Sequence, residues 1–567
     1  MPTNTSYPLT KTHVFSRVPR NNSIVYSTFD TSYRYLSAFD ASYLIPAVVK
    51  EVYPGDIFRM TGRHLNRLLT AVHPFMDNLT LSAFFFYCPT RLVWKSFKAF
   101  MGERRRPDST IGNDYQVPML NSGTSGVEVG SIFDYAGIPV GVPNLEFSSL
   151  PFRCINLAYN EWFRDENLCE WLQVGGTGSS SQELEDSEFG DSDQLSNYSL
   201  FKRAKAHDYF TSCLPFQQKG EAMAISIGST APVVSASTGI NDGRWLRNQA
   251  TQDTIAGSAL FSPISGMPSN IAGLGTSGLG AGTNVVPDLI ADLTNVTGFT
   301  ISDFRTAMQL QALKELNARS GTRYKEIING EWNVLISDAT LDRPEFLGSY
   351  RIPFNIVSVA STSETSDSPQ GNLAAYGLTN NDERFGFSKA FEEHGYVIGF
   401  LCVTGDQTYQ QGLQRFWSRK NRYDFYTPLL ANISEQAVKM KEIFAQGSEV
   451  LGEDGEPVDE KTFGYQEAWS DLRYGQNMVT GKMRSTANGT LDVWHLATKY
   501  AATVDGGHNL GIPLNQDFID DNTYFNLKRV LAVKDEPQIL SDNYFHFRCT
   551  RELPLYSVPA YLFGGRF

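Results

Sequence analysis

An eleven-residue apolar run, LTLSAFFFYCP at residues 79–89, limits the folds open to this chain more than any other segment. The run is far shorter than a membrane span, and its length and aromatic content favour a strand. A strand with one face in solvent alternates apolar and polar residues, whereas this run is apolar at most positions. The sequence therefore predicts a strand whose two faces are both buried.

Other segments predict further strands, separated by turns and a few helices. Pro54, Gly55 and Asp56 divide the segment 44–60 into strand, turn and strand. Further strands are expected at 221–228, 350–360, 396–405 and 544–553, and helices at 91–103, 152–168, 300–321 and 433–446. Separated strands with few helices and no βαβ repeat favour a mainly β, antiparallel sandwich with long inserted loops.

The composition excludes two broad classes of protein. The chain has 567 residues, of which 41% are hydrophobic and 13% aromatic, so general disorder is excluded. Its formal net charge is −13, whereas a protein that binds nucleic acid through bulk charge is basic. Any contact with nucleic acid must therefore come from a local patch.

The cysteines and the first residues indicate the compartment. Six cysteines occur without a CxxC pair: Cys88, Cys154, Cys169, Cys213, Cys402 and Cys549. We expect reduced, mostly buried thiols in a protein made in a reducing compartment. No apolar run of signal length begins the chain and no stretch of about 18 apolar residues occurs, so we expect a soluble protein without membrane insertion. Residues 1–43 are polar and predict an N-terminal arm before a main domain at 44–567.

Residues 230–298 are unusual for a loop inside a domain. They are rich in Gly, Ser and Thr, and their six charged residues are Asp242, Arg244, Arg247, Asp253, Asp288 and Asp292. A disordered linker of this length usually carries more charge or fewer Ile, Leu and Val residues. We therefore expect an ordered insertion that packs against other copies of itself.

No motif predicts catalysis, a cofactor or a metal. GLGTSG at 273–278 spells a dinucleotide motif, but its flanks lack the strand and helix that phosphate binding requires. The eight histidines do not lie at zinc-ligand spacings. Adjacent acid pairs, such as Glu392-Glu393 and Asp520-Asp521, usually point apart and suit a surface better than a catalytic dyad. We expect no enzyme activity, no cofactor and no metal site.

Three basic clusters are candidates for local contact with nucleic acid. Two of them are Arg104-Arg105-Arg106 and Lys202-Arg203-Lys205. The third is Arg415, Arg419, Lys420 and Arg422, interleaved with Phe416, Trp417, Tyr423 and Tyr426. Such a mixture suits single-stranded nucleic acid, because cations meet phosphates while rings stack on bases. The alternative is a solvated face or intersubunit ion pairs, with the aromatic rings in the core.

Seven segments of the chain, in family order, resemble the major capsid protein of the Microviridae, most closely the gokushovirus branch. They are HPFMDNLTLSAFFFYCPTRLVWKSFKAFMGE (73–103), LPFRCINLAYNEWFRDENL (150–168), DYFTSCLPFQQKG (208–220), SGTRYKEII (320–328), RPEFLG (343–348), DVWHLA (492–497) and FHFRCTRELPLYSVP (545–559). Together they extend over nearly the whole chain, which makes the resemblance specific.

The resemblance implies an eight-stranded viral jelly roll with large inserted loops. Copies would assemble into a T=1 icosahedral shell around circular single-stranded DNA, with a small basic DNA-binding protein as a further virion partner. In gokushoviruses an insertion forms protrusions at the threefold axes, and residues 230–298 lie at the corresponding position. We expect this insertion to contact a host cell-surface receptor, with candidate residues Arg244, Trp245, Leu260, Phe261 and Ile264.

The expected product is a structural protein of the virion, assembled in the cytoplasm of a host bacterium. The candidates for genome contact are the third basic cluster together with Arg104, Arg105 and Arg106. A phage receptor-binding or carbohydrate-binding β-sandwich is the alternative function, because aromatic residues and long loops also suit a binding module. Such a module works as a monomer or trimer, whereas a shell protein forms large closed particles.

Overall fold

The structure is a computed structural model of the 567-residue chain. It describes residues 25–103, 115–172, 174, 193–220, 301–364, 370–379, 382–502, 504–505, 507–520 and 527–556. Between residues 221 and 300 it describes the backbone of six short strands.

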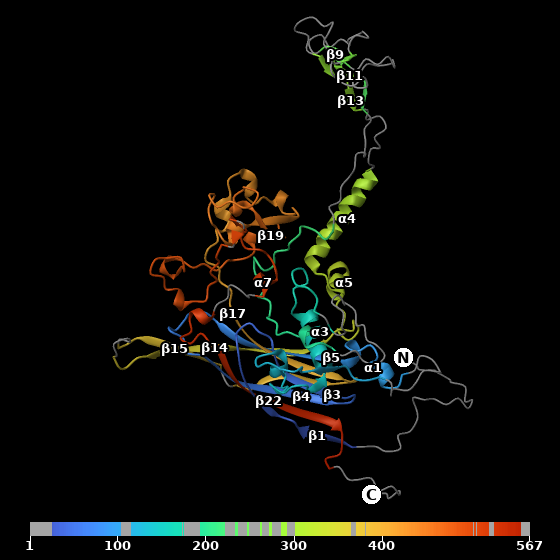
Figure 1. The fold of residues 1–567 in the computed structure, drawn as a ribbon, viewed down its shortest axis with the longest axis vertical. Helices are drawn as coiled ribbons and strands as arrows, with labels where there is room; N and C mark the ends of the chain where they lie inside the picture. Colours follow the sequence, from blue (N-terminus) through green and yellow to red (C-terminus); the bar gives the residue numbers. More distant parts are fainter. Residues whose placement is uncertain are drawn as a thin grey trace, which may run out of the picture. The chain divides into compact units, whose positions relative to one another are not determined.

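Ten antiparallel strands form the main sheet of the described chain (Figure 1). Their hydrogen-bonded order is β1-β22-β4-β15-β14-β5-β17-β3, while β2 also pairs with β22 and β16 with β4. The bounds are β1 Tyr26–Asp30, β2 Tyr33–Phe39, β3 Ile45–Val52, β4 Ile57–Leu68, β5 Leu79–Pro89, β14 Glu345–Ala360, β15 Leu373–Thr379, β16 Arg384–Ala390, β17 Gly395–Gly405 and β22 Ile539–Glu552. This mainly β architecture with long loops and few helices confirms the predicted fold class.

The N-terminal segment contributes two of the ten strands, so eight remain without it. β1 and β2 both pair with β22, and the side chains of Tyr33 and Tyr35 pack against the core. The Tyr33 hydroxyl donates a hydrogen bond of 3.0 Å to the carbonyl of Ala47. Residues 26–39 of the predicted arm therefore belong to the sheet, whereas residues 1–24 lie outside the described residues.

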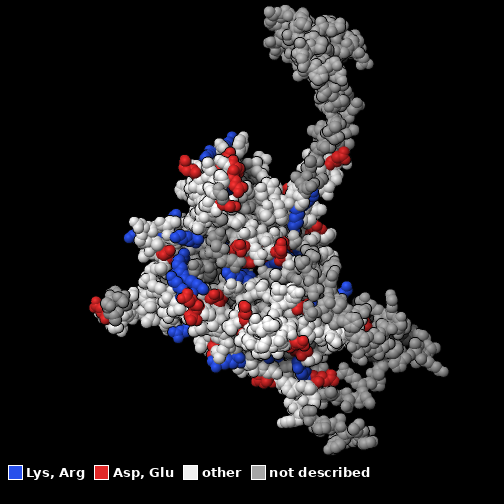
Figure 2. Space-filling model, in the orientation of Figure 1, with Lys and Arg blue, Asp and Glu red and all other residues white. Residues whose placement is uncertain are grey.

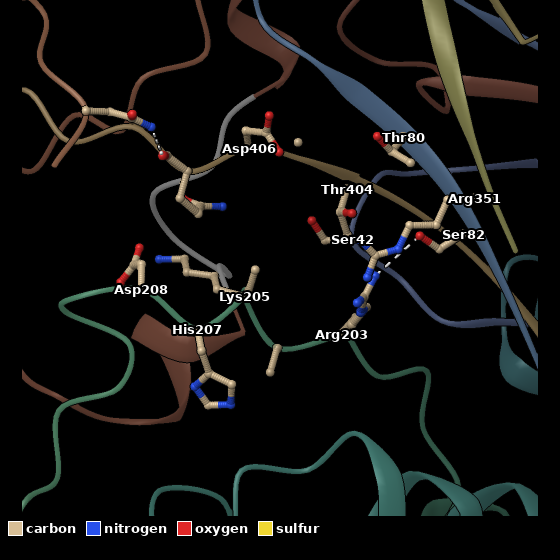
Figure 3. Close-up of a pocket in the computed structure, with 15 residues that line it drawn as sticks. Ser42, Thr80, Ser82, Arg203, Lys205, His207, Asp208, Arg351, Thr404 and Asp406 are labelled. Carbon is tan, nitrogen blue, oxygen red and sulfur yellow. Dashed lines mark hydrogen bonds between the residues drawn. The ribbon is translucent and has the colours of Figure 1, made fainter. Parts of the chain in front are cut away.

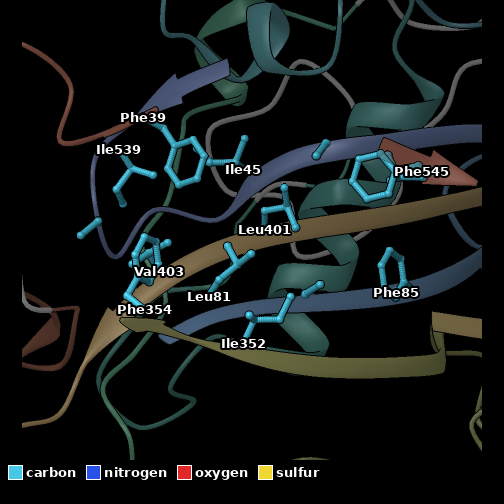
Figure 4. Close-up of a cluster of buried hydrophobic side chains, with 14 of the residues drawn as sticks. Phe39, Ile45, Leu81, Phe85, Ile352, Phe354, Leu401, Val403, Ile539 and Phe545 are labelled. Carbon is cyan, nitrogen blue, oxygen red and sulfur yellow. The ribbon is translucent and has the colours of Figure 1, made fainter. Parts of the chain in front are cut away.

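Strand β14 joins the two halves of the curled sheet. Its first part, up to Pro353, pairs with β5, and its second part, from Phe354, pairs with β15. The two halves enclose one apolar core, which Figure 4 shows in close-up. Its buried side chains include Phe39, Ile45, Leu81, Phe85, Ile352, Phe354, Leu401, Val403, Ile539 and Phe545.

β5 is buried on both faces, which confirms the prediction from its apolar run. Leu81 and Phe85 face the core between the sheet halves. Phe86 and Cys88 face the opposite way and pack in a second apolar cluster with helix α3 (Leu150–Trp162). The neighbouring strand β17 divides its residues between the same two clusters. The center of the sheet is thus covered on both sides, and its outer cover is α3.

The described helices are α1 Phe97–Phe100, α2 Ile132–Tyr135, α3 Leu150–Trp162, α4 Ile301–Ser320, α5 Tyr324–Trp332, α6 Met440–Ile443 and α7 Gln516–Ile519. α3 ends earlier than predicted, because the Asp165 carboxylate accepts hydrogen bonds from the Asn167 and Leu168 amides and turns the chain. α4 confirms the helix predicted at 300–321, and Gly321 ends it with a φ of +97°.

Two other helix predictions fail. The segment 91–103 contains a 3-10 turn and the one-turn helix α1 instead of a continuous helix. The prediction at 433–446 is wrong, because β18 (Glu435–Lys439) pairs there with β19 (Thr462–Glu467) and is followed by the short helix α6. Apolar residues of both elements enter a third buried cluster. This packing outweighs the intrinsic helix propensity of the segment.

The chain divides into two compact units, Gln218–Asn317 and the remainder. The first unit includes the predicted insertion 230–298, where paired short strands are described by their backbone alone. They are β8 Val233–Ser235 with β13 Leu289–Ala291, β9 Leu246–Asn248 with β12 Val285–Pro287, and β10 Phe261–Pro263 with β11 Ala272–Leu274. The predicted strand at 221–228 lies outside the described residues.

The other unit also contains two small pairs of strands, β6 Met119–Asn121 with β7 Glu146–Ser148 and β20 Val504–Asp505 with β21 His508–Asn509.

All six cysteines are free and buried, which confirms the prediction of reduced thiols. Burial raises the pKa of the Cys169 thiol to about 12, so little reactive thiolate forms there at neutral pH. Over the described part of the chain, no helix combines the length and apolar character that a membrane crossing needs.

Candidate nucleic-acid interface

The third basic cluster lies on a surface segment of short 3-10 turns, residues 415–430, named here the turn segment. The turns are Arg415–Ser418, Arg422–Asp424 and Pro428–Leu430. The Asp424 carboxylate accepts hydrogen bonds from the backbone amides of Asn421 and Lys420, at 2.7 and 2.8 Å. These bonds favour the charged carboxylate, so they lower the pKa of Asp424 below its ordinary value. The local sequence thus fixes the middle of the segment.

Two of the four candidate cations are held by carboxylates of this same chain. Arg415 Nη1 lies 3.4 Å from Glu442 Oε1 and donates to the carbonyl of Ala437 at 3.1 Å. Arg419 Nη2 lies 2.5 Å from Asp471 Oδ2. The two arginine side chains are only 19% and 13% exposed. Because both are paired with carboxylates of the domain, they anchor the turn segment to it.

Glu442 is the buried end of the first ion pair. Its carboxylate accepts hydrogen bonds from the Tyr209 hydroxyl at 2.7 Å and from the Lys439 amide at 3.0 Å. Burial raises the pKa of Glu442, while the charge of Arg415 and these hydrogen bonds oppose the rise. The network fixes Arg415 at the base of the turn segment.

Lys420 and Arg422 are exposed, and so are the aromatic side chains around them. The exposed fraction is 48% for Phe416, 69% for Trp417 and 78% for Tyr423. The alternative that these rings belong to the core is therefore wrong. Exposed apolar groups gathered on one segment mark an interaction site.

A pocket of about 320 Å³ lies beside the turn segment. Its charged lining consists of five basic side chains, Arg415, Arg419, Lys420, Lys439 and Lys441, and three carboxylates, Asp424, Glu442 and Glu460. The ammonium groups of Lys439 and Lys441 hydrogen-bond to Glu460 and lower its pKa to about 2. The pocket therefore has more positive than negative groups at neutral pH.

Lys439 and Lys441 are site residues that the sequence prediction missed. The erroneous helix at 433–446 hid them, because a helix places residues two apart on different faces. Lys439 is the last residue of β18 and Lys441 lies in α6, so no strand alternation signals the pair; Glu460 brings their ammonium groups together.

The side chains of the other predicted site residues lie outside the part of the chain that the structure describes. Arg104, Arg105 and Arg106 lie outside the described residues, as do Arg244, Trp245, Leu260 and Ile264. Of Phe261 the backbone alone is described, in β10. On the face drawn in Figure 2, basic and acidic side chains are intermixed, so positive charge there is local.

Within the described residues, no cluster of three or more His, Cys, Asp or Glu side chains could hold a metal ion. His64, for example, is a buried structural residue. Its Nδ1 lies 2.6 Å from Asn543 Oδ1, and its Nε2 lies 2.6 Å from the Tyr350 hydroxyl oxygen. Burial lowers the pKa of His64 to about 4, so the ring is neutral at neutral pH.

Comparison with known proteins decides the class of this chain. Residues 16–561 match a family of phage proteins described as capsid protein (F protein). The chain belongs to this capsid protein family. The matched residues include all ten strands of the main sheet, from β1 to β22.

Similar phage capsid proteins align with this one over almost their whole length. Capsid protein VP1 of Bdellovibrio phage phiMH2K is 38% identical over 571 residues, which cover 98% of each chain. The VP1 proteins of Chlamydia phage 1 and Spiroplasma virus 4 are 38% and 35% identical, over 96% and 97% of this chain and 97% and 98% of theirs. The predicted resemblance to gokushovirus capsid proteins is confirmed. The protein is a structural capsid component and not an enzyme.

Proposed function

We propose that this capsid protein builds a T=1 icosahedral shell around a circular single-stranded DNA genome. The observation that carries the proposal is the length of the family match, residues 16–561 of a 567-residue chain. The jelly roll buries its own core, so subunits meet through loops and edges. Long inserted loops are what a shell lattice needs from such a fold.

Negative-stain electron microscopy of the expressed full chain tests this proposal. We expect closed particles of uniform size. Monomers or trimers at every concentration would contradict it and favour the alternative, a receptor-binding or carbohydrate-binding β-sandwich.

The turn segment is the proposed contact with the genome. Lys420 and Arg422 supply exposed charge for phosphates, and the exposed rings of Trp417 and Tyr423 can stack on bases. Arg415, like Arg419, already has a carboxylate partner, so we assign these two residues to positioning the segment. Arg104, Arg105 and Arg106 stay candidates on sequence grounds.

The charge balance supports a further virion partner, and the cysteines support a place of assembly. A chain with a net charge of −13 does not neutralise a DNA genome alone, which supports a small basic DNA-binding protein as virion partner. Six free cysteines fit assembly in the reducing cytoplasm of a host bacterium.

Host attachment is assigned to residues 230–298, as a threefold protrusion that contacts a cell-surface receptor. The segment is part of a separate compact unit and contains apolar residues that three copies can bury together. Replacing 230–298 by a short Gly/Ser linker should leave a soluble, β-rich protein whose particles fail to adsorb to host cells. Normal adsorption by such particles would place the receptor surface elsewhere, and loss of the fold would show that the segment belongs to the core.

A further inference from the structure

A second basic pocket, of about 330 Å³, lies on the outer face of β14, β5 and β17. Strand register builds its floor, because Ser82 of β5 lies opposite both Arg351 of β14 and Cys402 of β17. Two residues away, Thr80 of β5 lies opposite Thr404 of β17. Paired residues of antiparallel strands face the same side. The face that α3 covers further along the sheet therefore becomes polar at this end.

The segment 201–208 covers this floor and supplies Arg203. The Arg203 amide donates a hydrogen bond of 2.8 Å to the carbonyl of Ser42, which fixes the segment above the sheet. The guanidinium then donates to Ser82 Oγ at 3.4 Å and lies 4.9 Å from the center of the Phe84 ring. Arg203 is thus held in the pocket by its backbone and by stacking, and no carboxylate among the described residues pairs with it.

The guanidinium groups of Arg203 and Arg351 converge beside Ser82, as Figure 3 shows. In the described part of the chain, neither group forms an ion pair with a carboxylate. Arg153 and Arg419, by contrast, each pair with an aspartate, at 2.7 and 2.5 Å. Burial lowers the pKa of Arg203, and the nearby charge of Arg351 lowers it further. Neighbouring like charges repel each other, and an anion bound between them relieves this repulsion.

The two carboxylates that line the pocket are engaged by other groups. Asp208 Oδ2 accepts a hydrogen bond of 2.6 Å from the Tyr409 hydroxyl, and its Oδ1 accepts two backbone amides. Asp406 Oδ2 accepts a hydrogen bond of 3.0 Å from Asn78 Nδ2. Neither carboxylate takes the place of an external anion at Arg203.

The rest of the lining suits a tetrahedral oxyanion. Hydroxyl groups of Ser42, Thr80 and Thr404 line the same space, so neutral donors surround the two guanidinium groups. Lys205, a residue that is 9% exposed, adds a third cation, and its Nζ lies 4.3 Å from the center of the Phe518 ring. Guanidinium forks and hydroxyls together match the several oxygens of a phosphate.

We propose that this pocket binds a phosphate group, with Arg203 and Arg351 as its two principal ligands. The phosphate can belong to the backbone of single-stranded DNA or be free in solution. The residues of this pocket are not part of the turn segment. Phosphate binding itself is independent of the proposed contact with the genome, and only DNA as the source of the phosphate rests on that proposed function.

Titration calorimetry of the full chain with inorganic phosphate at constant ionic strength tests the pocket itself. Arg351→Gln should weaken binding about tenfold or more, because a charge-assisted hydrogen bond is lost. Arg203→Lys, which keeps the charge but not the fork, should weaken it less than Arg203→Gln. Arg59→Gln is the matched control, since Arg59 is an exposed strand residue of β4 that also lacks a carboxylate partner in the described chain.

Fluorescence anisotropy with an oligothymidylate identifies the source. If DNA supplies the phosphate, Arg351→Gln should lower the slope of log affinity against log salt by about 0.7, and Arg59→Gln should not. Phosphate binding without any effect of Arg351→Gln on DNA would support a site for free phosphate. Absence of phosphate binding, or equal losses in Arg351→Gln and Arg59→Gln, would overturn the proposal whether or not the protein forms shells.

Discussion

Two aromatic-rich segments of this protein have opposite surroundings. The rings at 84–87 of β5 lie in the interior, where Phe85 and Phe86 are each 1% exposed. The rings of the turn segment lie on the surface, where Trp417 is 69% and Tyr423 78% exposed. The difference is what stands between the rings: β5 has no charged residue there, whereas the turn segment has four basic residues. Interleaved charges keep a segment in water and leave its rings for a partner.

The largest expected effect comes from exchanging one ring in each region for alanine. Phe85→Ala should lower the free energy of unfolding by about 3–5 kcal/mol, because it leaves a cavity in a packed core. Trp417→Ala should change it by less than about 0.5 kcal/mol, because the ring is in solvent. Urea unfolding of the unassembled chain, followed by circular dichroism, measures both. Equal losses would contradict the comparison.

A buried carboxylate gives the next largest effect, through pH. Burial raises the pKa of Asp520 to about 6 from 3.8, so the folded state binds the proton more tightly than the unfolded chain. The free energy of unfolding therefore falls as pH rises from about 4 to above 6. Asp520→Asn should remove this dependence and stabilise the protein at pH 8 by about 2–3 kcal/mol. Unfolding at pH 4 and pH 8 measures the difference.

Asp424 in the turn segment is the matched control, with the opposite sign. Its pKa is lowered, so its contribution to stability is present above the unfolded-state pKa and is lost as pH falls through the folded value. Asp424→Asn should therefore destabilise slightly at pH 8. A stabilising effect of both substitutions at pH 8 would show that the buried carboxylate of Asp520 and the carboxylate of the turn segment do not differ in this way.

Single-stranded DNA should distinguish the exposed rings from ordinary exposed apolar groups. Trp417→Ala should weaken binding of an oligothymidylate by about 1–3 kcal/mol, the usual contribution of one stacked base. Leu429→Ala, at a residue that is 97% exposed but not aromatic, should leave the affinity unchanged. Anisotropy titrations of the full chain compare the two. Equal weakening would exclude base stacking as the source of affinity.

The smallest effect concerns the two exposed cations. Charge reversal of Lys420 and Arg422 to glutamate should lower the DNA content of particles without preventing shells, because the ion-paired Arg415 and Arg419 are left in place. The ratio of absorbance at 260 and 280 nm in purified particles measures packaged DNA, with Arg59→Glu as control. Normal DNA content in the double variant would remove these side chains from the proposed contact.

The interior of this protein is predictable from local sequence, because burial follows the period of the strand. The run at 79–89, apolar at most positions, predicts a strand covered on both faces, and the structure confirms it. At 433–446 the local pattern fits a helix, and pairing with β19 decides otherwise. Such pairing depends on residues elsewhere in the chain, which the local periodicity of one segment does not include.

The candidate sites show the same limit more strongly. Composition is enough to predict that Trp417 and Tyr423 belong to an interaction site. It does not predict that Arg415 and Arg419 form ion pairs within the chain. Their partners, Glu442 and Asp471, lie 27 and 52 positions away. The phosphate pocket depends on strand register and on a covering segment far along the chain. The basic cluster at 202–205 supplies Arg203 and Lys205, but no local motif signals their convergence with Arg351.

A cryo-EM map of DNA-containing particles of the full chain tests the central claim most directly. The claim is that this capsid protein forms a closed shell with the turn segment toward the genome. We expect a T=1 shell in which the side chains of Trp417 and Tyr423 lie on the inner surface against density for DNA. The same side chains on the outer surface of the shell would contradict the account.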